Sequence, residues 1–421
     1  MTPLPTPAAS RLLRAPPFPG MANAMHMFSP LPEVDAPTGD TRTALFRSVS
    51  NARVGGSYWS EPIAPLAIDT AIRPRSASEA AELRARFGAE KTICIGHPHA
   101  SPLRTAALDY GADIDPWAVL SQTGKLVAHG DDEWVALATI AGIHVQVLSP
   151  GRYGEPGDDG ETLEYRAAMA LAEPMRDPFS DGWLEPAKAI ELLADWRRVI
   201  DANRGTAGQT IVAACGISWW KREEIRRFLW VPGEPLKIAR TSAGALAVAE
   251  ARGGALAVWP SRISKSLLAN AEKRGVPIVR VEDGFVRSVG LGSNLVPPSS
   301  VIVDRRGIHF DPGHPSDLET ILQNEEFSHD LIERARLLRK TIVDTGISKY
   351  ARAAKRMAAQ VIGTREGRIV LVPGQVEDDM SVLAGGGGLT SNLELLRRVR
   401  AEEPEAQIWW RPHPDVDAGH R

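Results

Sequence analysis

Three short segments of the chain carry residue types that could do chemistry on a charged or hydroxylated ligand. The first, RVEDGFVRS, places Glu282 and Asp283 at the end of an apolar run. Adjacent carboxylates repel each other and lose hydration when buried, so a cation must pair with them, and Arg280 or Arg287 could do so. The pattern predicts either a structural salt-bridge cluster or a carboxylate for acid–base work or for holding a sugar hydroxyl.

The second segment, VLVPGQVEDDMS, delivers Gln375, Glu377, Asp378 and Asp379 directly after an apolar run. Carboxylates in such a position can act as nucleophile, general base or metal ligand, although a solvated turn has the same composition. Beyond them come four consecutive glycines and a helix that begins near Ser391. This layout favours either an anion site at backbone N–H groups or a flexible loop.

The third segment, WWRPHPDVDAGHR, places Arg411 and His413 two residues apart after an apolar run. Side chains at this spacing face the same side of a strand, so both could contact one phosphate or leaving group. A surface histidine beside proline is the alternative interpretation. No metal site is predicted: His97-Pro98-His99 has no nearby ligand cluster, and the two cysteines are too few for a four-cysteine zinc site.

The elements that must position these segments follow from the alternation of apolar runs and helical patterns. After residue 205 this alternation predicts an α/β fold with a largely parallel sheet. Capping boxes at Ser316 with Glu319 and at Ser391 with Glu394 mark two helix starts. The expected strands cover 211–215, 255–259, 277–281, 301–303, 369–372 and 407–410, and the expected helices cover 219–230, 264–274, 315–323, 329–345 and 391–401.

The amino-terminal half has a weaker pattern. We expect residues 1–60 to be a disordered proline-rich leader, residues 61–151 to form a small βα lobe, and residues 152–205 to be a linker with a bridging amphipathic helix at 185–203. Composition limits the function: 43% hydrophobic and 24% charged residues describe an ordinary globular protein, and a net charge of −3 argues against nucleic-acid binding. The longest apolar run is too short to span a bilayer, and the two cysteines suit a cytoplasmic protein.

The three segments lie within longer stretches that resemble a known family. EDGFVRSVGLGSNLVPPSS, ISKY, VLVPGQVEDDMSV and SNLELLRRVRAEEPEAQIWWRPHPDVDAG are similar in order and spacing to the capsular polysaccharide β-Kdo transferases, a family of capsule polysaccharide biosynthesis and export proteins. The resemblance implies a GT-B-like glycosyltransferase with Rossmann-type lobes. It further implies transfer of Kdo from CMP-Kdo to a lipid-linked Kdo or glycan acceptor, with retention and no cofactor. No metal is required, and a cation at Asp378 and Asp379 is the alternative. Capsule export machinery and a peripheral place on the inner membrane are further expectations from the family.

The resemblance also assigns roles to residues. It implies that Asp379 is the nucleophile and Glu282 the acid–base group, and that Asp283 shapes the acceptor side. The remaining expected site residues fall into an acceptor group, Arg287 and Ser288, and a donor or phosphate group, Arg411, His413, Gln375, Glu377 and Asp378.

Family members often carry two transferase modules, which implies a domain plan. Residues 61–151 would be the remnant carboxyl-terminal lobe of a degenerate first module, 206–362 the acceptor lobe of the second, and 363–421 the start of a truncated nucleotide-binding lobe. Val135 stands where the first module would have an acid, and Arg411 stands where the family usually has lysine. A non-catalytic capsule assembly component and a GT-B transferase for another nucleotide sugar remain the alternatives.

Overall fold

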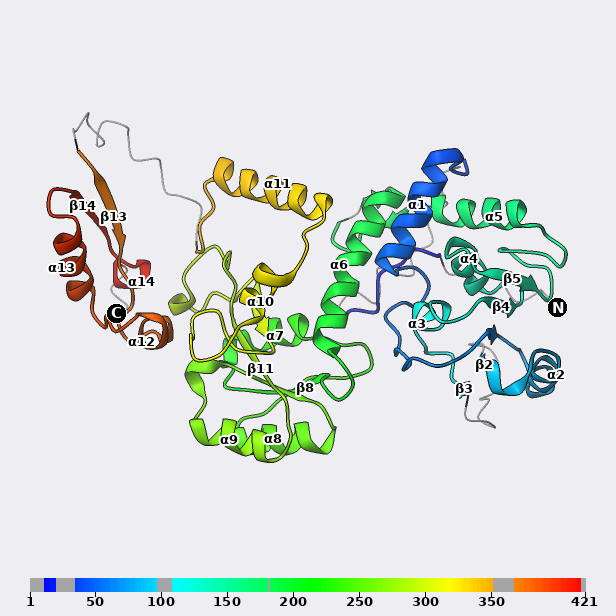
Figure 1. Cartoon of the computed structure of the whole chain (residues 1–421), viewed down its shortest axis with the longest axis horizontal. Coiled ribbons are helices and arrows are strands. Elements are labelled where there is room, and N and C mark those ends of the chain that lie inside the picture. Colours follow the sequence, from blue (N-terminus) through cyan, green and yellow to red (C-terminus); the bar gives the residue numbers. More distant parts are fainter. Residues whose placement is uncertain (1–10, 20–34, 97–107, 181, 351–366, 418–421) are drawn as a thin grey trace, which may run out of the picture. The chain divides into compact units, whose positions relative to one another are not determined.

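The computed structural model describes residues 11–19, 35–96, 108–180, 182–350 and 367–417 (Figure 1). The chain divides into two compact units, Met1–Ala202 and Asn203–Arg421. None of the helices in these described ranges combines the length and the apolar character that a membrane span requires.

The first unit is built on a five-stranded parallel sheet in the order β3-β2-β1-β4-β5. Its strands are β1 (Thr70–Ile72), β2 (Thr92–Ile95), β3 (Asp109–Tyr110), β4 (Lys125–Ala128) and β5 (His144–Val147), and a small hairpin joins β6 (Met175–Arg176) to β7 (Trp183–Leu184). Its helices are α1 (Gly39–Ala52), α2 (Ala77–Phe87), α3 (Pro116–Leu120), α4 (Glu133–Ile140), α5 (Gly160–Ala172) and α6 (Pro186–Arg204). The alternation of strands and helices expected over residues 61–151 is present in this sheet and in α2 to α4.

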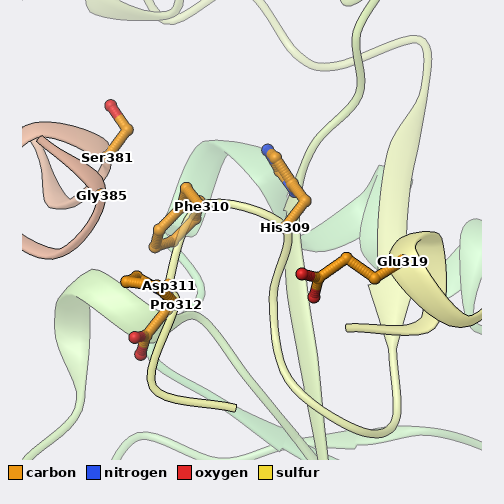
Figure 2. Close-up of a pocket in the computed structure, with 7 residues that line it drawn as sticks. All are labelled: His309, Phe310, Asp311, Pro312, Glu319, Ser381 and Gly385. Carbon is orange, nitrogen blue, oxygen red and sulfur yellow. The ribbon is translucent and has the colours of Figure 1, made fainter. Parts of the chain in front are cut away.

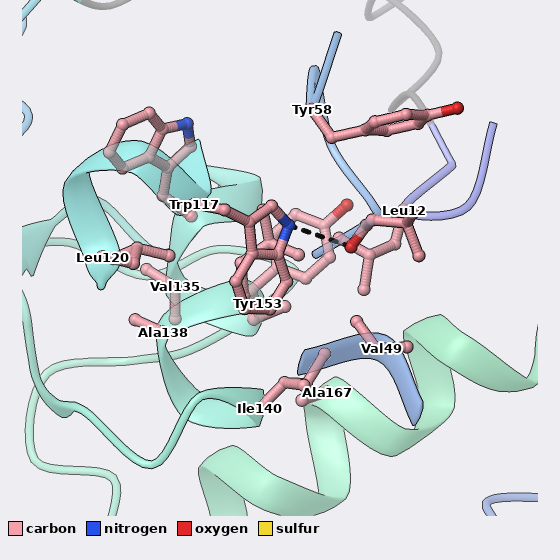
Figure 3. Packing of buried hydrophobic residues seen from close by; sticks show 14 of the residues in the cluster. Leu12, Val49, Tyr58, Trp117, Leu120, Val135, Ala138, Ile140, Tyr153 and Ala167 are labelled. Atoms are coloured by element: carbon pink, nitrogen blue, oxygen red, sulfur yellow. Dashed lines mark hydrogen bonds between the residues drawn. The ribbon is translucent and has the colours of Figure 1, made fainter. Parts of the chain in front are cut away.

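The expectation of a disordered leader over residues 1–60 is wrong for its described part. Leu12 and Leu13 are buried in the core of the first unit, and the Leu12 carbonyl accepts a hydrogen bond from the Gly56 N–H at 2.8 Å. Helix α1 follows and buries Val49 in the same core (Figure 3). The proline-rich composition of this segment suggested disorder, although two of its apolar side chains are buried. The free energy gained by burying Leu12 and Leu13 favours the packed segment over a disordered one.

The expected linker over 152–205 is also wrong. Helix α5 buries Leu163 and Leu171 in the core of the first unit, and α6 buries Ile190 and Leu193 there. The helix expected at 185–203 is thus confirmed as α6, but it packs on this unit as a core helix. Glycine and proline around residues 150–182 mark turns between packed elements, which composition alone does not separate from a linker.

The second unit contains a five-stranded sheet in the order β12-β11-β10-β8-β9. All neighbours are parallel except β12, which runs antiparallel to β11. The strands are β8 (Ile211–Cys215), β9 (Lys237–Ile238), β10 (Ala255–Val258), β11 (Ile278–Asp283) and β12 (Val301–Asp304). The helices that follow them are α7 (Arg222–Phe228), α8 (Ser242–Ala251), α9 (Lys265–Lys273), α10 (Asp317–Asn324) and α11 (His329–Thr345), with 3₁₀ turns at η3 (Trp219–Lys221), η4 (Pro260–Arg262) and η5 (Gly292–Asn294).

Both faces of this sheet are covered, which explains why its central strands are apolar throughout. Every residue of β8 and β10 is buried, as parallel strands between two helical layers require. Helices α8 and α9 lie together on one face (Figure 1) and bury Leu246 and Leu267 against it, while Ile225 of α7 belongs to the core cluster of the other face.

The chain continues into a parallel pair, β13 (Ile369–Pro373) and β14 (Gln407–Arg411). Helices α12 (Met380–Gly385) and α13 (Asn392–Glu402) lie between these strands in sequence, and α14 (Pro414–Asp417) follows. The expected α/β class with largely parallel sheets is confirmed, as are both capping boxes. The sequence analysis missed β9 and α8, and it did not foresee the antiparallel β12.

Candidate active site

The first expected segment lies at the carboxyl end of β11. Asp283 is the last residue of this strand, and its carboxylate forms ion pairs with Lys221 Nζ at 3.0 Å and with Arg287 Nε at 2.8 Å. Of the two arginines considered from the sequence, Arg287 therefore makes the pair, whereas Arg280 reaches the Arg306 carbonyl. Two cations thus compensate the charge of this one carboxylate.

Lys221 is a site residue that the sequence analysis missed. It ends the 3₁₀ turn after β8 and is 7% exposed, with its ammonium 3.7 Å from the centre of the Trp259 ring. Burial lowers the pKa of Lys221, and the charge of Asp283 opposes that shift. The available signal was a lysine six residues after a buried strand, in ISWWK, at the edge where open α/β sheets bind ligands.

Glu282 differs from its neighbour because no ion pair holds it among the described residues. Burial raises the pKa of Glu282 to about 7. The charges of Asp283 and Asp379 add to the increase, while the Asp283 N–H, which donates to Glu282 Oε1 at 3.0 Å, and Lys221 oppose it. A carboxyl group with a pKa near neutrality can both give and take a proton.

Arg287 and Ser288 form a connected pair beneath this edge. Arg287 is fully buried and donates through Nη1 to Ser288 Oγ at 2.6 Å, and Ser288 in turn donates to the Gly290 carbonyl. The Arg287 N–H donates to the Lys349 carbonyl at 2.9 Å, which ties this loop to the ISKY segment. Arg287 Nη2 is buried and has no hydrogen-bond partner among the described residues.

The second and third segments meet at one edge because β13 and β14 are parallel, with Pro373 opposite Arg411. Asp379 is exposed at the start of α12, where its Oδ1 accepts from the Ser381 N–H at 2.9 Å and from Ser381 Oγ at 2.7 Å. Its charge influences the pKa of both Glu282 and His413. The structure thus brings these three groups of the second unit into electrostatic range of one another.

The other polar residues after β13 have different surroundings. Glu377 accepts the Asn392 N–H at 2.8 Å and so stabilises the start of α13, while the Gln375 backbone pairs with the Asn392 side chain. Asp378 is exposed. Gly387 and Gly388 follow α12 with positive φ angles, and the anion site expected at this loop stays a prediction.

Arg411 and His413 do not alternate along a strand, so that expectation is wrong. Strand β14 ends at Arg411, and His413 lies between two prolines before α14. His413 Nδ1 accepts the Asp415 N–H at 3.2 Å, which leaves Nε2 to carry the proton of the neutral ring. Burial lowers the pKa of His413, so the ring is neutral at pH 7, whereas the Arg411 side chain is exposed.

The described residues contain no group of three or more histidine, cysteine, aspartate or glutamate side chains that could hold a metal ion. His97-Pro98-His99 lies outside the described residues. The candidate chemical groups described above are carboxylates, the His413 imidazole and cations, which follow the carboxyl ends of parallel strands of the second unit.

Comparison with known proteins agrees with this description. Residues 254–421 match the family described as "Capsule polysaccharide biosynthesis protein", and this match confirms the resemblance. A curated relative, "Capsule polysaccharide modification protein LipA" of Neisseria meningitidis serogroup B, is 38% identical over 232 residues, which cover 55% of this chain and 32% of the relative. "Lipopolysaccharide-processing protein LpsZ" of Rhizobium meliloti is 36% identical over 219 residues, covering 50% of this chain and 49% of the relative.

Two solved structures are also similar in sequence. The Thermosulfurimonas dismutans KpsC β-Kdo 2,7 transferase is 32% identical with a TM-score of 0.36, and the match covers 48% of this chain and 62% of that chain. The β-Kdo 2,4 transferase of the same KpsC is 28% identical with a TM-score of 0.39, covering 50% and 63%. The chain spans between a third and a half of the length of the curated relatives that it matches.

Proposed function

We propose that the second unit belongs to a retaining, GT-B-like glycosyltransferase of capsule polysaccharide biosynthesis, which moves Kdo from CMP-Kdo to a lipid-linked Kdo or glycan acceptor. The observation that carries the proposal is the contrast between Glu282, whose pKa burial raises to about 7, and its neighbour Asp283, which is paired with Lys221 and Arg287. In enzymes that act on glycosidic bonds, a carboxyl group with a raised pKa typically serves as the acid–base residue beside a second carboxyl group. The family match and the order of the motifs support the same conclusion.

Asp379 is our nucleophile for the first displacement. Its carboxylate forms a bond to the anomeric carbon of Kdo while the bond from that carbon to the CMP phosphate oxygen breaks, and CMP leaves with the electron pair. The neutral His413, with a proton on Nε2, and the exposed Arg411 guanidinium would hold the departing phosphate. Gln375, Glu377 and Asp378 support this donor side.

Glu282 serves the second displacement. In its ionised form it accepts the proton of the acceptor hydroxyl, whose oxygen attacks the anomeric carbon and releases Asp379. Asp283 and Ser288 shape the acceptor side, where Arg287 Nη2 offers a donor to an acceptor oxygen. The capsule export machinery at the cytoplasmic face of the inner membrane would receive the product.

A trapped intermediate tests the proposal directly. We expect incubation with CMP-Kdo to give a Kdo adduct by intact-protein mass spectrometry, and peptide mapping to place it on Asp379. Asp379→Asn should remove the adduct and lower transfer on the order of 10³-fold or more, since an amide cannot attack the anomeric carbon.

Asp378→Asn removes the same charge one residue away, on the donor side, and should lower transfer much less than Asp379→Asn and still give the adduct. An adduct mapped to Asp283 would transfer the nucleophile role to the carboxylate held by Lys221 and Arg287. A parent chain that binds CMP-Kdo and forms neither adduct nor product would favour a non-catalytic assembly role.

A further inference from the structure

A small pocket lies in the second unit where the loop after β12 approaches α12 (Figure 2). Its volume is about 260 Å³. The loop after β12, one residue of α10 and two residues of α12 line it: His309, Phe310, Asp311, Pro312, Glu319, Ser381 and Gly385. This volume is slightly below the range of about 300–1,000 Å³ that is usual for ligand sites, so the pocket suits one small ring and not an extended chain.

Two contacts join the pocket to the proposed reacting groups. Ser381 lines the pocket and donates through its hydroxyl to Asp379 Oδ1 at 2.7 Å. On the other side, the ring of Phe285 lies edge-on to the ring of His309 with centroids 5.2 Å apart, and Phe285 is three residues beyond Glu282. A ligand in the pocket would therefore lie next to Ser381, which contacts Asp379. It would also lie next to His309, whose ring contacts Phe285, a residue three positions after Glu282.

The polar lining is suited to hydroxyl groups. His309 Nδ1 is buried and has no hydrogen-bond partner among the described residues. Burial, and then the charge of Lys349, lower the pKa of His309, so its ring is neutral at pH 7 and offers one donor and one acceptor. Glu319 stays ionised because hydrogen bonds from Ser316 lower its pKa.

The carboxylates of Glu319 and Asp311 keep acceptor capacity after their internal bonds. Glu319 Oε2 accepts from Ser316, and Asp311 Oδ1 accepts from the Gly313 N–H at 2.9 Å. Among the described residues the second oxygen of each carboxylate has no hydrogen bond, so it can accept from an incoming O–H donor. The same charges oppose a phosphate, because like charges at short range repel.

We propose that this pocket binds the hydroxylated ring of the acceptor sugar and excludes phosphate. Phe310 supplies an apolar surface for the C–H face of the ring, while His309 and the two carboxylates bind its hydroxyl groups. Any carboxylate on that sugar lies outside the pocket, away from Asp311 and Glu319. The assignment to the acceptor rests on the proposed function, and the binding of a sugar here can be measured without catalysis.

The experiment follows the imidazole signals of His309 by NMR in the full chain. The probe is the methyl glycoside of a β-linked Kdo disaccharide, with inorganic phosphate as the control ligand. We expect the disaccharide to shift the His309 signal saturably and phosphate to leave it unchanged. Phe310→Ala should weaken the disaccharide affinity about tenfold, and Phe327→Ala, which removes a 41% exposed ring outside the pocket, should not change it.

Asp311→Asn is the second variant, for use if Phe310→Ala does not fold, and should weaken disaccharide binding about threefold because it removes one acceptor. The proposal is overturned if the disaccharide does not shift the His309 signal, or if phosphate shifts it by the same amount. The two proposals fail separately. If the chain forms the Kdo adduct but the His309 signal does not respond to the disaccharide, only the subsite proposal is wrong. If the disaccharide shifts the His309 signal but neither adduct nor transfer is found, only the proposed function is wrong.

Discussion

The carboxyl edges of the two large sheets use similar residue types in different ways. In the first unit, Arg73 follows β1 and pairs with Asp132 at 2.7 Å, and both side chains are buried. His129 follows β4, with Nδ1 2.9 Å from Ser149 Oγ and Nε2 3.1 Å from Glu79. These charged and polar groups bind one another, so this edge is held together as structure.

The equivalent edge of the second unit is only partly paired. Lys221 and Arg287 hold Asp283, yet Glu282 keeps a pKa of about 7 and Arg287 Nη2 keeps a donor without a partner among the described residues. Val135 of the first unit shows the same difference between the two units. The family resemblance would place an acid at this position, but the valine is fully buried in the core (Figure 3). The same layered fold thus serves packing at one edge and leaves groups for chemistry at the other.

The largest expected effect tests whether the first edge is structural. Arg73→Ala leaves the Asp132 carboxylate buried without its partner, and removes the bond from Arg73 Nη1 to the Gly96 carbonyl. We expect the free energy of unfolding of the first unit to fall by about 3–5 kcal/mol. Urea unfolding followed by hydrogen exchange of the β1 and β4 amides measures it.

Arg75→Ala is the matched control, since Arg75 and its partner Asp131 are both exposed and such a pair contributes about 0–1 kcal/mol. Equal losses in the two variants would show that the buried pair does not hold the first edge together, and the contrast between the two sheets would disappear.

The second prediction concerns Glu282 and pH. The folded-state pKa of about 7 lies above the ordinary value of 4.5, so the folded state binds the proton more tightly. The contribution of Glu282 to stability is therefore full below about pH 4.5 and declines as the pH rises to about 7. Glu282→Gln carries no charge, and its stability relative to the parent should increase by about 2–3 kcal/mol between pH 5 and pH 8.

Thermal unfolding of the parent and of Glu282→Gln across this pH range provides the measurement. Glu272→Gln removes a carboxylate of α9 that is exposed, and should show no such trend. If both variants respond to pH alike, Glu282 is not desolvated, and the second edge is as fully satisfied as the first.

The sequence predicted the second unit better than the first for physical reasons. Runs such as IVAAC and ALAV become fully buried parallel strands, and capping boxes set two helix starts, so local pattern and tertiary structure agree there. In the first unit, two leucines among prolines pack into the core, and a helix follows a glycine-rich stretch that composition assigned to a linker. Burial decided both cases, and burial depends on contacts distant in sequence.

The residues of the candidate site also fall into those that the sequence could predict and those that it could not. Glu282, Asp283 and Arg287 were recognised because a strand, two acids and a basic residue follow one another in sequence. Lys221 could not be paired with Asp283 from sequence, because the two are 62 positions apart and meet only through strand order. The pocket at His309 needs α12 against the loop after β12, which no local pattern specifies.

The smallest expected effect tests that last contact. Gly385 ends α12, and a Cβ at this position would lie 2.5 Å from the Phe310 carbonyl oxygen, closer than real Cβ atoms approach backbone. Alanine usually stabilises a helix by about 0.5–1 kcal/mol relative to glycine. Here the helix and the loop must separate, so we expect Gly385→Ala to lower the free energy of unfolding by about 1 kcal/mol and to weaken disaccharide binding at His309.

Gly160→Ala, at the start of α5 with no neighbour within 4 Å, is the matched control and should be neutral or slightly stabilising. Thermal unfolding of both variants, together with the His309 titration, separates the two cases: if Gly385→Ala stabilises the protein as Gly160→Ala does and leaves the titration unchanged, α12 does not form a wall of the pocket, and the second edge has only its carboxylates and cations to bind an acceptor.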